Sequence, residues 1–432
     1  MSQTWWSAPA AEGAVTGTVT VPGSKSESNR ALILAALADD PSKLTGVLWA
    51  RDTELMINGL RALGHELDVT APNAVGNVDI DVTPHMMTTS TTIDCGLAGT
   101  VMRFLPPLAA LARGEITFTG DKEARQRPMA TLIEALRDLG VRVHDGDTGR
   151  IPFILEGRGE VLGGEVTLDA SRSSQFVSAL LLSAARYESG ITIHHVGPPV
   201  PSQPHIQMTI AMLAEHGVLV HTSDASVWHV DPHDVASVDR AIEPDLSNAT
   251  PFLAAAVVTA GAVTIPGWPA HSLQPGNHFL DIVELMGAQV TRHGSGVRVL
   301  GSSSIQGIDI DLAAAGEITP TIAALAALAE GPSTLRGIGH LRGHETDRLD
   351  AISTELAALG ANVTATEDSL HIVPGALHPR KMHTYADHRM ATMAAIIGLR
   401  CPGIEIENIG TTAKTMPNFP KMWSALISGE PS

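Results

Sequence analysis

Cysteine and aromatic residues are scarce in this sequence, and each shortage excludes something. The only cysteines are Cys95 and Cys401. A disulfide scaffold and a structural zinc site are therefore not expected, and a reducing cytoplasm is the predicted location. Aromatic residues make up 3% of the chain, whereas hydrophobic residues make up 44%. The core must be built from Ala, Leu, Val and Ile, which suits close packing of helices against sheets.

Positive charge and long apolar runs are also lacking. The chain has 28 Lys and Arg against 46 Asp and Glu, a formal net charge of −18. A field of that sign repels nucleic acid and anionic membranes, so neither is an expected partner. No apolar run reaches the roughly 18 residues of a membrane span, and the segment MSQTWWSAPAAEGAV has no signal-peptide pattern. Any anionic substrate must be held by a local basic site.

What the sequence does contain is a repeat. A period of roughly 70 residues fills the chain six times, longer than the roughly 20–50 residues of common solenoid repeats. Each period has an Ala/Leu-rich helix opened by small polar residues, and most add an amphipathic helix that ends at glycine and leads into a strand. The glycines expected as left-handed C-caps are Gly64, Gly140, Gly217, Gly287 and Gly360.

Six such α/β modules, each with its own sheet, predict two halves of three, because 432 residues are too many for one ordinary core. A break at Ile242–Asp245 separates the third module from the fourth. The first strand, before Gly23, is expected to join the second half, because the ends of a chain commonly lie together. The predicted domains are residues 24–243, and residues 1–23 together with 244–432.

Small polar residues recur near the start of the Ala/Leu-rich helices. They are Ser28, Thr100, Ser173, Thr319 and His388. A helix N-terminus carries free N–H groups and partial positive charge, and it binds anions. If the modules pack in parallel, several such ends meet and form a phosphate site. For any single residue ordinary N-capping is the favoured interpretation; for the set, we favour an anion site.

Two motifs place basic side chains beside these helix starts. PGSKSESNR (22–30) brings Lys25, Ser26 and Arg30 into a strand-to-helix turn, where they suit a phosphate or carboxylate. EARQRPM (123–129) places Arg127 before Pro128, which is the expected first residue of a helix. The alternative for each motif is a solvated surface turn.

Further motifs add hydroxyl, carboxylate and basic groups. Gly99 in DCGLAGTVMRF allows a ligand to approach the backbone, and SRSSQF offers Ser173 and Ser174 to a phosphate, with simple capping as the alternative. In GHETDR an internal salt bridge between Glu345 and Arg348 is the simpler interpretation. YADHRM and TAKTMP add Arg389 and Lys414. The motifs HExxH, GxxxxGK[ST] and GxSxG are missing, so a zinc protease, a P-loop protein and a nucleophile-elbow hydrolase are not indicated.

Taken together, the motifs resemble those of the 5-enolpyruvylshikimate-3-phosphate synthase family. PGSKSESNRAL, LAGTVMRF, RQRPM, SSQF, ETDR, DHRMA and TAKTMP occur in that family's order and at about its spacings. The resemblance implies an α/β fold of two similar domains, each of three βαβαββ units. It also implies a cytoplasmic transferase of the shikimate pathway, in aromatic amino-acid biosynthesis, that needs no metal or organic cofactor.

The implied reaction joins two small molecules. The 5-hydroxyl of shikimate 3-phosphate attacks C2 of phosphoenolpyruvate, and phosphate leaves the tetrahedral intermediate. These substrates are the predicted partners, and the predicted state is a monomer. The resemblance also implies sensitivity to glyphosate, because insensitive members carry Ala where this chain has Gly99.

The resemblance assigns roles residue by residue. Implied to bind shikimate 3-phosphate are Lys25, Ser26, Arg30, Ser173, Ser174, Gln175, Ser202, Glu317, His340 and His344. Implied to bind phosphoenolpyruvate are Lys25, Gly99, Arg127, Gln175, Arg348, Arg389 and Lys414. Implied as catalytic are Lys25, Glu317 and Glu345. Glu317 has no basic residue nearby in sequence, so we expect it to be freer than Glu345 to accept the proton of the 5-hydroxyl. Glu345 then serves the phosphoenolpyruvate side, with Lys25 as the acid.

Four positions depart from the commoner residues of that family. Glu317 stands in place of Asp, His205 in place of Tyr, His340 in place of Asn and His344 in place of Lys. The extra methylene of Glu317 moves the carboxylate of the implied base. Two histidines near the anion site are expected to make substrate affinity depend on pH.

Two other functions stay open at this point. The first is the related UDP-N-acetylglucosamine enolpyruvyl transferase, whose members have Asn after the N-terminal Lys and a cysteine in the loop near Arg127. Here Ser26 follows Lys25, and GDKEARQRP has no cysteine. The second is a binding protein of the same fold without catalysis, which the complete set of basic residues and both carboxylates disfavour.

Overall fold

The strands form six small sheets in the residues that the computed structural model describes, which are 4–87, 90–294 and 296–430. Five sheets have four strands and one has three. In each sheet two strands are parallel, and every remaining strand lies antiparallel to its neighbour. One sheet pairs β6 (Thr91–Asp94) in parallel with β7 (Arg113–Thr119), followed by antiparallel β9 (Phe153–Arg158) and β8 (Arg142–His144). A parallel pair needs a crossover connection, and helix α3 (Gly99–Ala109) supplies it here.

The predicted βαβαββ repeat is confirmed along the chain. After β6, α3 and β7 come α4 (Ala130–Asp138), β8 and β9. The next repeat consists of β10 (Gly164–Leu168), α5 (Gln175–Ala184), β11 (Ile191–His195), α6 (Gln203–Glu215), β12 (His221–Asp224) and β13 (Val227–Val230). A later one consists of β18 (Asp309–Asp311), α9 (Thr319–Ala327), β19 (Ser333–Arg336), α10 (Arg348–Leu359), β20 (Asn362–Ala365) and β21 (Leu370–Val373).

The other three sheets each take a strand from a distant part of the chain. In one, β14 (Arg240–Ala241) lies parallel to β3 (Ser42–Leu48), which β5 (Asn77–Thr83) and β4 (Glu66–Val69) follow. In another, β2 (Thr16–Thr18) lies parallel to β15 (Ala262–Pro266), which β17 (Gly296–Leu300) and β16 (Gln289–His293) follow. In the three-stranded sheet, β1 (Trp5–Ser7) lies antiparallel to β23 (Glu405–Glu407), whose other neighbour is β22 (Lys381–Met382). The helices of these repeats are α1 (Lys25–Leu37), α2 (Arg51–Ala62), α7 (Leu246–Thr259), α8 (His278–Leu285), α11 (His388–Gly398) and α12 (Phe419–Ser428).

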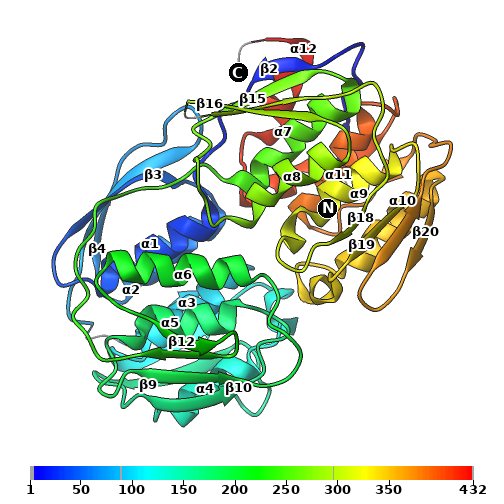
Figure 1. Cartoon of the computed structure of the whole chain (residues 1–432). Helices are drawn as coiled ribbons and strands as arrows, with labels where there is room; N and C mark the ends of the chain where they lie inside the picture. Colours follow the sequence, from blue (N-terminus) through cyan, green and yellow to red (C-terminus); the bar gives the residue numbers. More distant parts are fainter. Residues whose placement is uncertain (1–3, 88–89, 295, 431–432) are drawn as a thin grey trace. The chain divides into compact units, whose positions relative to one another are not determined.

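The chain divides into two units, each with its own hydrophobic core. The first unit is Gly23–Ile242, and the second is Met1–Pro22 together with Glu243–Ser432. Three sheets belong to each unit, and Figure 1 traces both along the sequence. β2 belongs to the second unit although α1, which follows it in the chain, belongs to the first.

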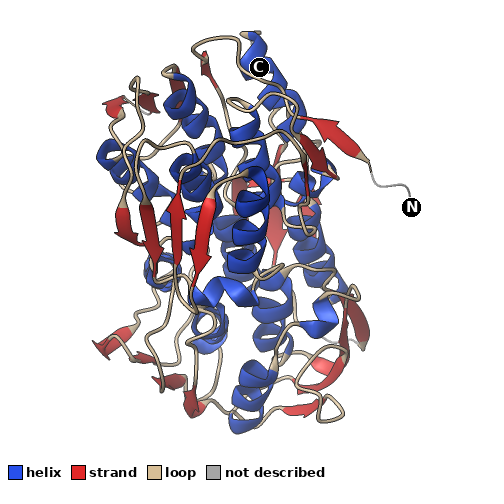
Figure 2. Cartoon of the chain, turned by 90° about the vertical axis from the view of Figure 1, so that its right-hand side faces the viewer, coloured by secondary structure: helices blue, strands red, loops and turns tan. Residues whose placement is uncertain are grey.

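Three apolar helices form the centre of each unit. In the first unit α1, α3 and α5 contact one another, and in the second α7, α9 and α11 do so. Figure 2 shows helices inside and strands toward the outside. These helices are buried nearly all round; in α1 eleven of 13 residues are buried. The small side chain of alanine allows helices to approach one another closely. A core with few aromatic residues can therefore be built by packing helix on helix.

The second kind of helix is amphipathic and ends as predicted. Gly64, Gly140, Gly217, Gly287 and Gly360 all have a left-handed backbone, with φ between 81° and 115°.

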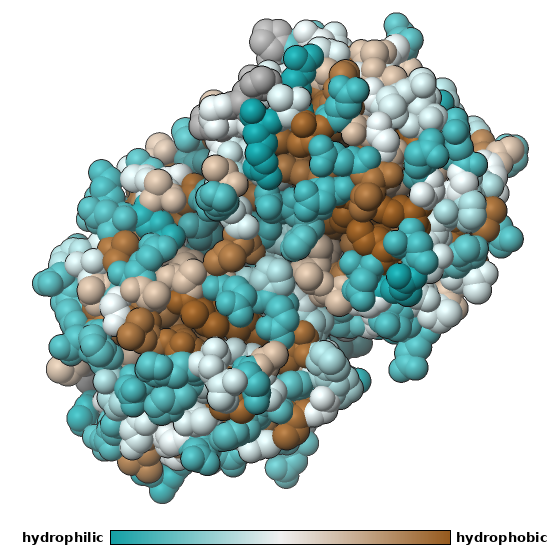
Figure 3. All heavy atoms as spheres, viewed as in Figure 1, coloured by the Kyte–Doolittle hydropathy of each residue, from teal (hydrophilic) through white to brown (hydrophobic). Residues whose placement is uncertain are grey.

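On the face drawn in Figure 3, hydrophilic residues are interspersed with apolar ones. None of the helices in the described ranges combines the length and apolarity that crossing a membrane requires.

One helix start agrees with the sequence prediction and one differs. α1 begins at Lys25, three residues before Ser28, and the Ser24 hydroxyl caps it by accepting from the Glu27 amide at 3.4 Å. The prediction that Pro128 is the first residue of α4 is wrong. That helix begins at Ala130, after Met129, whose non-helical amide donates instead to the Gly149 carbonyl at 2.8 Å.

Candidate functional site

The starts of the three central helices lie side by side in the first unit. The Asn29 amide of α1 donates to the Thr100 hydroxyl of α3 at 2.5 Å. Arg103 of α3 donates through Nη1 to Oε1 of Gln175, the first residue of α5, at 3.3 Å. The first turns of α1, α3 and α5 are thus joined by side-chain hydrogen bonds, and the predicted meeting of helix starts is found within this unit.

Arg30 is fixed inside the first unit. Its side chain is buried, with Nε donating to the Thr209 hydroxyl at 2.7 Å and Nη1 to the Ser26 carbonyl at 2.9 Å. Nη2 donates to the His205 carbonyl at 3.1 Å, and the guanidinium lies over the Phe104 ring, 5.1 Å from its centroid. A solvated surface charge, the alternative for this residue, is excluded by this burial.

Lys25 is the first residue of α1 and pairs with an acidic residue that the sequence analysis did not identify. Its Nζ lies 3.3 Å from Oδ2 of Asp52, the second residue of α2. Asp52 is buried, whereas the Lys25 side chain keeps 20% of its surface exposed. A buried carboxylate therefore holds the ammonium, and part of the Lys25 side chain is exposed.

Two arginines face the backbone at Gly99. A Cβ added there would lie 3.0 Å from Nη1 of Arg103 and 3.1 Å from each terminal nitrogen of Arg127. Arg103 also donates to the Gly99 carbonyl at 3.2 Å, and Arg127 donates to the Leu97 carbonyl at 3.2 Å. Arg103 is a residue that the sequence analysis missed. Its place in LAGTVMRF, one helical turn after Gly99, is the signal that identifies it.

The serines implied in phosphate binding differ in whether their side chains make a capping hydrogen bond. Ser173 accepts from the Gln175 amide at 3.3 Å, so capping accounts for it. Ser174 is the buried N-cap residue of α5, and its side chain makes no capping bond. Ser202 is the N-cap residue of α6, also without a side-chain capping bond, and its backbone is left-handed with φ +53°.

Arg348 is the centre of the charged cluster in the second unit. It is buried, and Nε donates to Oδ2 of Asp387 at 2.7 Å while Nη2 donates to Oδ1 at 3.3 Å. Nη2 also bonds Glu345 at 3.0 Å, and the Lys414 ammonium bonds the other oxygen of Glu345 at 2.5 Å. Burial by itself lowers the pKa of Arg348, but the Asp387 and Glu345 carboxylates outweigh burial and raise that pKa above its ordinary value. The salt bridge between Glu345 and Arg348 that the spacing indicated is present, within a larger network.

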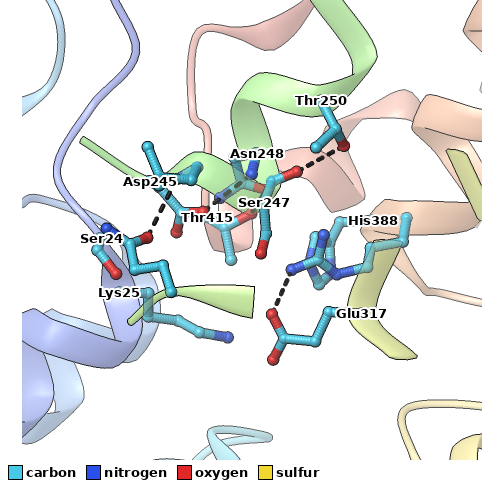
Figure 4. A network of polar contacts seen from close by, with 12 residues as sticks. Ser24, Lys25, Asp245, Ser247, Asn248, Thr250, Glu317, His388 and Thr415 are labelled. Carbon is cyan, nitrogen blue, oxygen red and sulfur yellow. Dashed lines mark hydrogen bonds and ion pairs between the residues drawn. The ribbon is translucent and has the colours of Figure 1, made fainter. Parts of the chain in front are cut away.

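Glu317 has a basic partner that its neighbours in the sequence did not indicate. It lies in a short 3-10 turn (Gly316–Ile318) directly before α9, and its Oε2 accepts from Nη2 of Arg389 at 3.0 Å. Figure 4 shows this pair beside His388 and the start of α7. The partner comes from α11, 72 residues along the chain, so no local sequence signal revealed it.

Two of the departing histidines lie next to each other. The His340 and His344 rings meet edge to face, with centroids 5.9 Å apart, and Nδ1 of His344 lies 3.3 Å from Nη1 of Arg348. Burial, aided by the positive charge of Arg348, lowers the pKa of His340 to about 4. His340 is therefore neutral near pH 7.

Polar groups also line the start of α7. Asp245 caps this helix by accepting from the Asn248 amide at 2.9 Å, and the Thr415 hydroxyl lies 3.3 Å from Oδ1 of Asn248 (Figure 4). The Thr250 hydroxyl lies 3.2 Å from that of Thr321 in α9. Helix starts thus lie side by side in this unit too. Across the described ranges, no group of three or more His, Cys, Asp or Glu side chains is arranged to hold a metal ion.

The fold and these clusters define a six-module α/β protein with arginines and lysines at its helix starts. Solved structures share this fold. An EPSP synthase structure from Acinetobacter baumannii is 25% identical, has a TM-score of 0.80 and covers 98% of both chains. The enolpyruvyl transferase NikO from Streptomyces tendae, 18% identical with a TM-score of 0.74, covers 98% of this chain and 97% of its own, and shows the fold alone.

Sequence comparison gives the family. Residues 9–423 match the family described as EPSP synthase (3-phosphoshikimate 1-carboxyvinyltransferase). The 3-phosphoshikimate 1-carboxyvinyltransferase of Kocuria rhizophila is 52% identical over 431 residues, covering 98% of this chain and 97% of that protein. The chain belongs to the EPSP synthase family.

Proposed function

We propose that this chain is the enzyme that transfers the carboxyvinyl group of phosphoenolpyruvate to the 5-hydroxyl of shikimate 3-phosphate. Family membership over residues 9–423 is the observation that carries the proposal. In the reaction the hydroxyl oxygen bonds C2 of phosphoenolpyruvate, and C3 gains a proton. In the second step C3 loses a proton and the bond from C2 to the phosphate oxygen breaks, which releases inorganic phosphate.

Shikimate 3-phosphate is assigned to the hydroxyl and basic groups at the helix starts of the first unit. Lys25, Ser26, Arg30, Ser173, Ser174, Gln175 and Ser202 would contact it, with Glu317, His340 and His344 from the second unit. The uncommitted side chains of Ser174 and Ser202 support this role, since neither makes a capping bond. Helix N-termini favour a dianionic phosphate.

Phosphoenolpyruvate is assigned to the arginines and lysines. Its proposed contacts are Lys25, Gly99, Arg127, Gln175, Arg348, Arg389 and Lys414. Gly99 leaves the Arg127 guanidinium room beside the backbone. Asp387 holds one edge of the Arg348 guanidinium, while Glu345 and His344 contact its other nitrogens. A planar carboxylate or a phosphate would therefore bind this preorganised group by sharing or replacing the Glu345 contact.

Glu317, Glu345 and Lys25 are assigned to proton transfer. Glu317 would accept the proton of the 5-hydroxyl after its pair with Arg389 opens. Glu345, which binds Lys414 and Arg348, would exchange the proton that C3 of phosphoenolpyruvate gains and loses. Lys25 would protonate the leaving phosphate. A positioned acid or base contributes about 10²–10⁴-fold in rate. We further propose a cytoplasmic monomer that needs no metal or organic cofactor.

An assay for phosphate release tests the function. Phosphoenolpyruvate and shikimate 3-phosphate together should release phosphate and yield the carboxyvinyl ether, whereas either alone should not. UDP-N-acetylglucosamine in place of shikimate 3-phosphate is the control acceptor and should give no product. Turnover of that acceptor, or binding of both substrates without phosphate release, would contradict the proposal.

A further inference from the structure

The turn before α11 has an unusual backbone. Tyr385 and Ala386 are both left-handed, with φ of 54° and 56°. A left-handed residue other than glycine costs roughly 1–2 kcal/mol, and such strain persists only where the surroundings hold it. Elsewhere in the described residues, non-glycine residues of this kind occur singly, at Asp147, Ser202, Ala260 and Asn408.

This turn sets the direction of Asp387. The turn closes through the Asp387 amide, which donates to the Thr384 carbonyl at 2.8 Å. The Asp387 carboxylate then accepts from the Arg389 amide at 2.8 Å and from two nitrogens of Arg348. Because Asp387 is fully buried, it has no room to reorient independently of the turn. The backbone at Tyr385 and Ala386 therefore positions Arg348 and the start of α11.

Two carboxylates hold the strained turn. The Tyr385 hydroxyl donates to Oε1 of Glu355 at 2.9 Å, and the His383 amide donates to the other oxygen of Glu355 at 3.3 Å. The Thr384 amide donates to Glu407 at 3.3 Å. Among these three bonds, the one from Tyr385 comes from a side chain, and Tyr385 is itself one of the two left-handed residues. Glu355, the acceptor, is buried, whereas Tyr385, whose side chain reaches it, is 37% exposed.

Helix α10 contacts the turn at two points. Glu355 and Arg348 are seven residues apart in this helix, which places them two turns apart on one face. Glu355 binds Tyr385 at one point, and Arg348 binds Asp387 at the other. Burial, with the hydrogen bond to Glu355 and its charge, raises the pKa of Tyr385 to about 12. The hydroxyl therefore keeps its proton and remains a donor throughout the neutral pH range.

We propose that Tyr385 is a positioning residue for the phosphoenolpyruvate-binding arginines: its bond to Glu355 holds the left-handed turn that aims Asp387 at Arg348. Tyr385 acts through Asp387 and is not assigned a contact with the substrate. The identity of the anion rests on the proposed function. The role of Tyr385 in aiming Arg348 rests on the contacts within the second unit.

The variant Tyr385→Phe removes the hydroxyl and keeps the ring. Loss of one hydrogen bond to a charged group corresponds to about tenfold in an equilibrium constant. We expect phosphoenolpyruvate affinity to fall about tenfold, measured from the rise in melting temperature with phosphoenolpyruvate concentration and from KM. The kcat should stay within about threefold, and the KM for shikimate 3-phosphate should be unchanged.

The chain offers a control, because the hydroxyl of its other tyrosine also donates a hydrogen bond. Tyr187, in the first unit, donates to the Pro107 carbonyl at 3.1 Å. Tyr187→Phe should lower the melting temperature without changing phosphoenolpyruvate affinity. In Tyr385→Phe, adding Ala386→Gly should restore that affinity, because glycine adopts a positive φ without steric cost.

Each outcome decides the proposal. A Tyr385→Phe protein that binds phosphoenolpyruvate as the wild type does, or one that Ala386→Gly fails to restore, overturns it. If the wild type binds phosphoenolpyruvate but releases no phosphate, the proposed function fails, while the affinity series still decides the role of Tyr385. A wild type without phosphoenolpyruvate affinity overturns both.

Discussion

Glu317 and Arg389 form an ion pair, with Oε2 of the carboxylate 3.0 Å from Nη2 of the guanidinium. The two residues lie at the starts of neighbouring helices, α9 and α11. The side chains are mostly buried, with 25% of Glu317 and 11% of Arg389 exposed. A proposed base and a proposed anion-binding group thus contact each other directly, so either substrate would change the environment of both.

The first prediction concerns Glu317 as the base. Glu317→Gln keeps the shape and a hydrogen-bond acceptor for Arg389 but removes the basic oxygen. We expect kcat to fall on the order of 10²–10⁴-fold, with shikimate 3-phosphate binding within a few-fold of the wild type. Glu317→Asp should keep much of the activity. Normal turnover by Glu317→Gln together with inactive Glu345→Gln would show that the two carboxylates have exchanged roles.

The second prediction concerns Gly99 and the inhibitor glyphosate. A methyl group there would lie about 3 Å from the Arg103 and Arg127 nitrogens, closer than ordinary carbon contacts, so these side chains must shift. Gly99→Ala should therefore weaken glyphosate inhibition more than it raises the KM for phosphoenolpyruvate. Steady-state inhibition at several phosphoenolpyruvate concentrations measures both constants. Equal losses would show that the methyl group does not discriminate between the two ligands.

The third prediction concerns the buried pair of Arg348 and Asp387. Arg348→Met leaves the Asp387 carboxylate buried without its guanidinium partner, and breaking such a pair costs roughly 3–5 kcal/mol. The matched control is Arg342→Met, which removes a half-exposed partner of Asp347 and should cost less than about 1 kcal/mol. Chemical denaturation measures both values. Similar losses of unfolding free energy in the two variants would show that burial does not make the first ion pair more important than the second.

The fourth prediction concerns acid stability. His340 has a pKa of about 4 in the folded chain, below its ordinary 6.5, because burial and Arg348 disfavour its charged form, although Asp368 and Glu317 oppose this. The unfolded chain therefore binds this proton more readily. The stability it confers is complete above about pH 6.5 and is lost as pH falls toward 4.

In His340→Asn, the acid-induced loss in the free energy of unfolding should be smaller, by an amount on the order of 1–3 kcal/mol at pH 4. The measurement is the free energy of unfolding from urea titrations between pH 4 and 7. His65, in the first unit, has its pKa lowered to about 4 mainly by burial, so part of the acid sensitivity should remain in His340→Asn. An unchanged pH slope in His340→Asn would show that His340 does not titrate as its burial requires.

The sequence by itself determined the repeat, and the physical reason is local. Periodic apolar positions, N-caps and C-terminal glycines act within a few residues, so the six α/β modules and the five left-handed glycines could be read directly, whereas the βαβαββ order came from the family resemblance. The motifs likewise placed basic residues at helix starts. They did not give the start of α4, because the Met129 amide donates to a carbonyl 20 residues later in the chain.

Only the tertiary structure decided which charges pair. Arg389 meets Glu317 across 72 residues, Lys414 meets Glu345 across 69, and Arg348 meets Asp387 across 39. Such pairs depend on helix packing, which no local pattern encodes. The sequence therefore did not reveal Arg389 as the partner of Glu317, and the contacts of Asp52 with Lys25 and of Arg103 with Gln175 were not predicted. Sequence identified the residue types that bind anions; packing decided the partners that hold each of them in place.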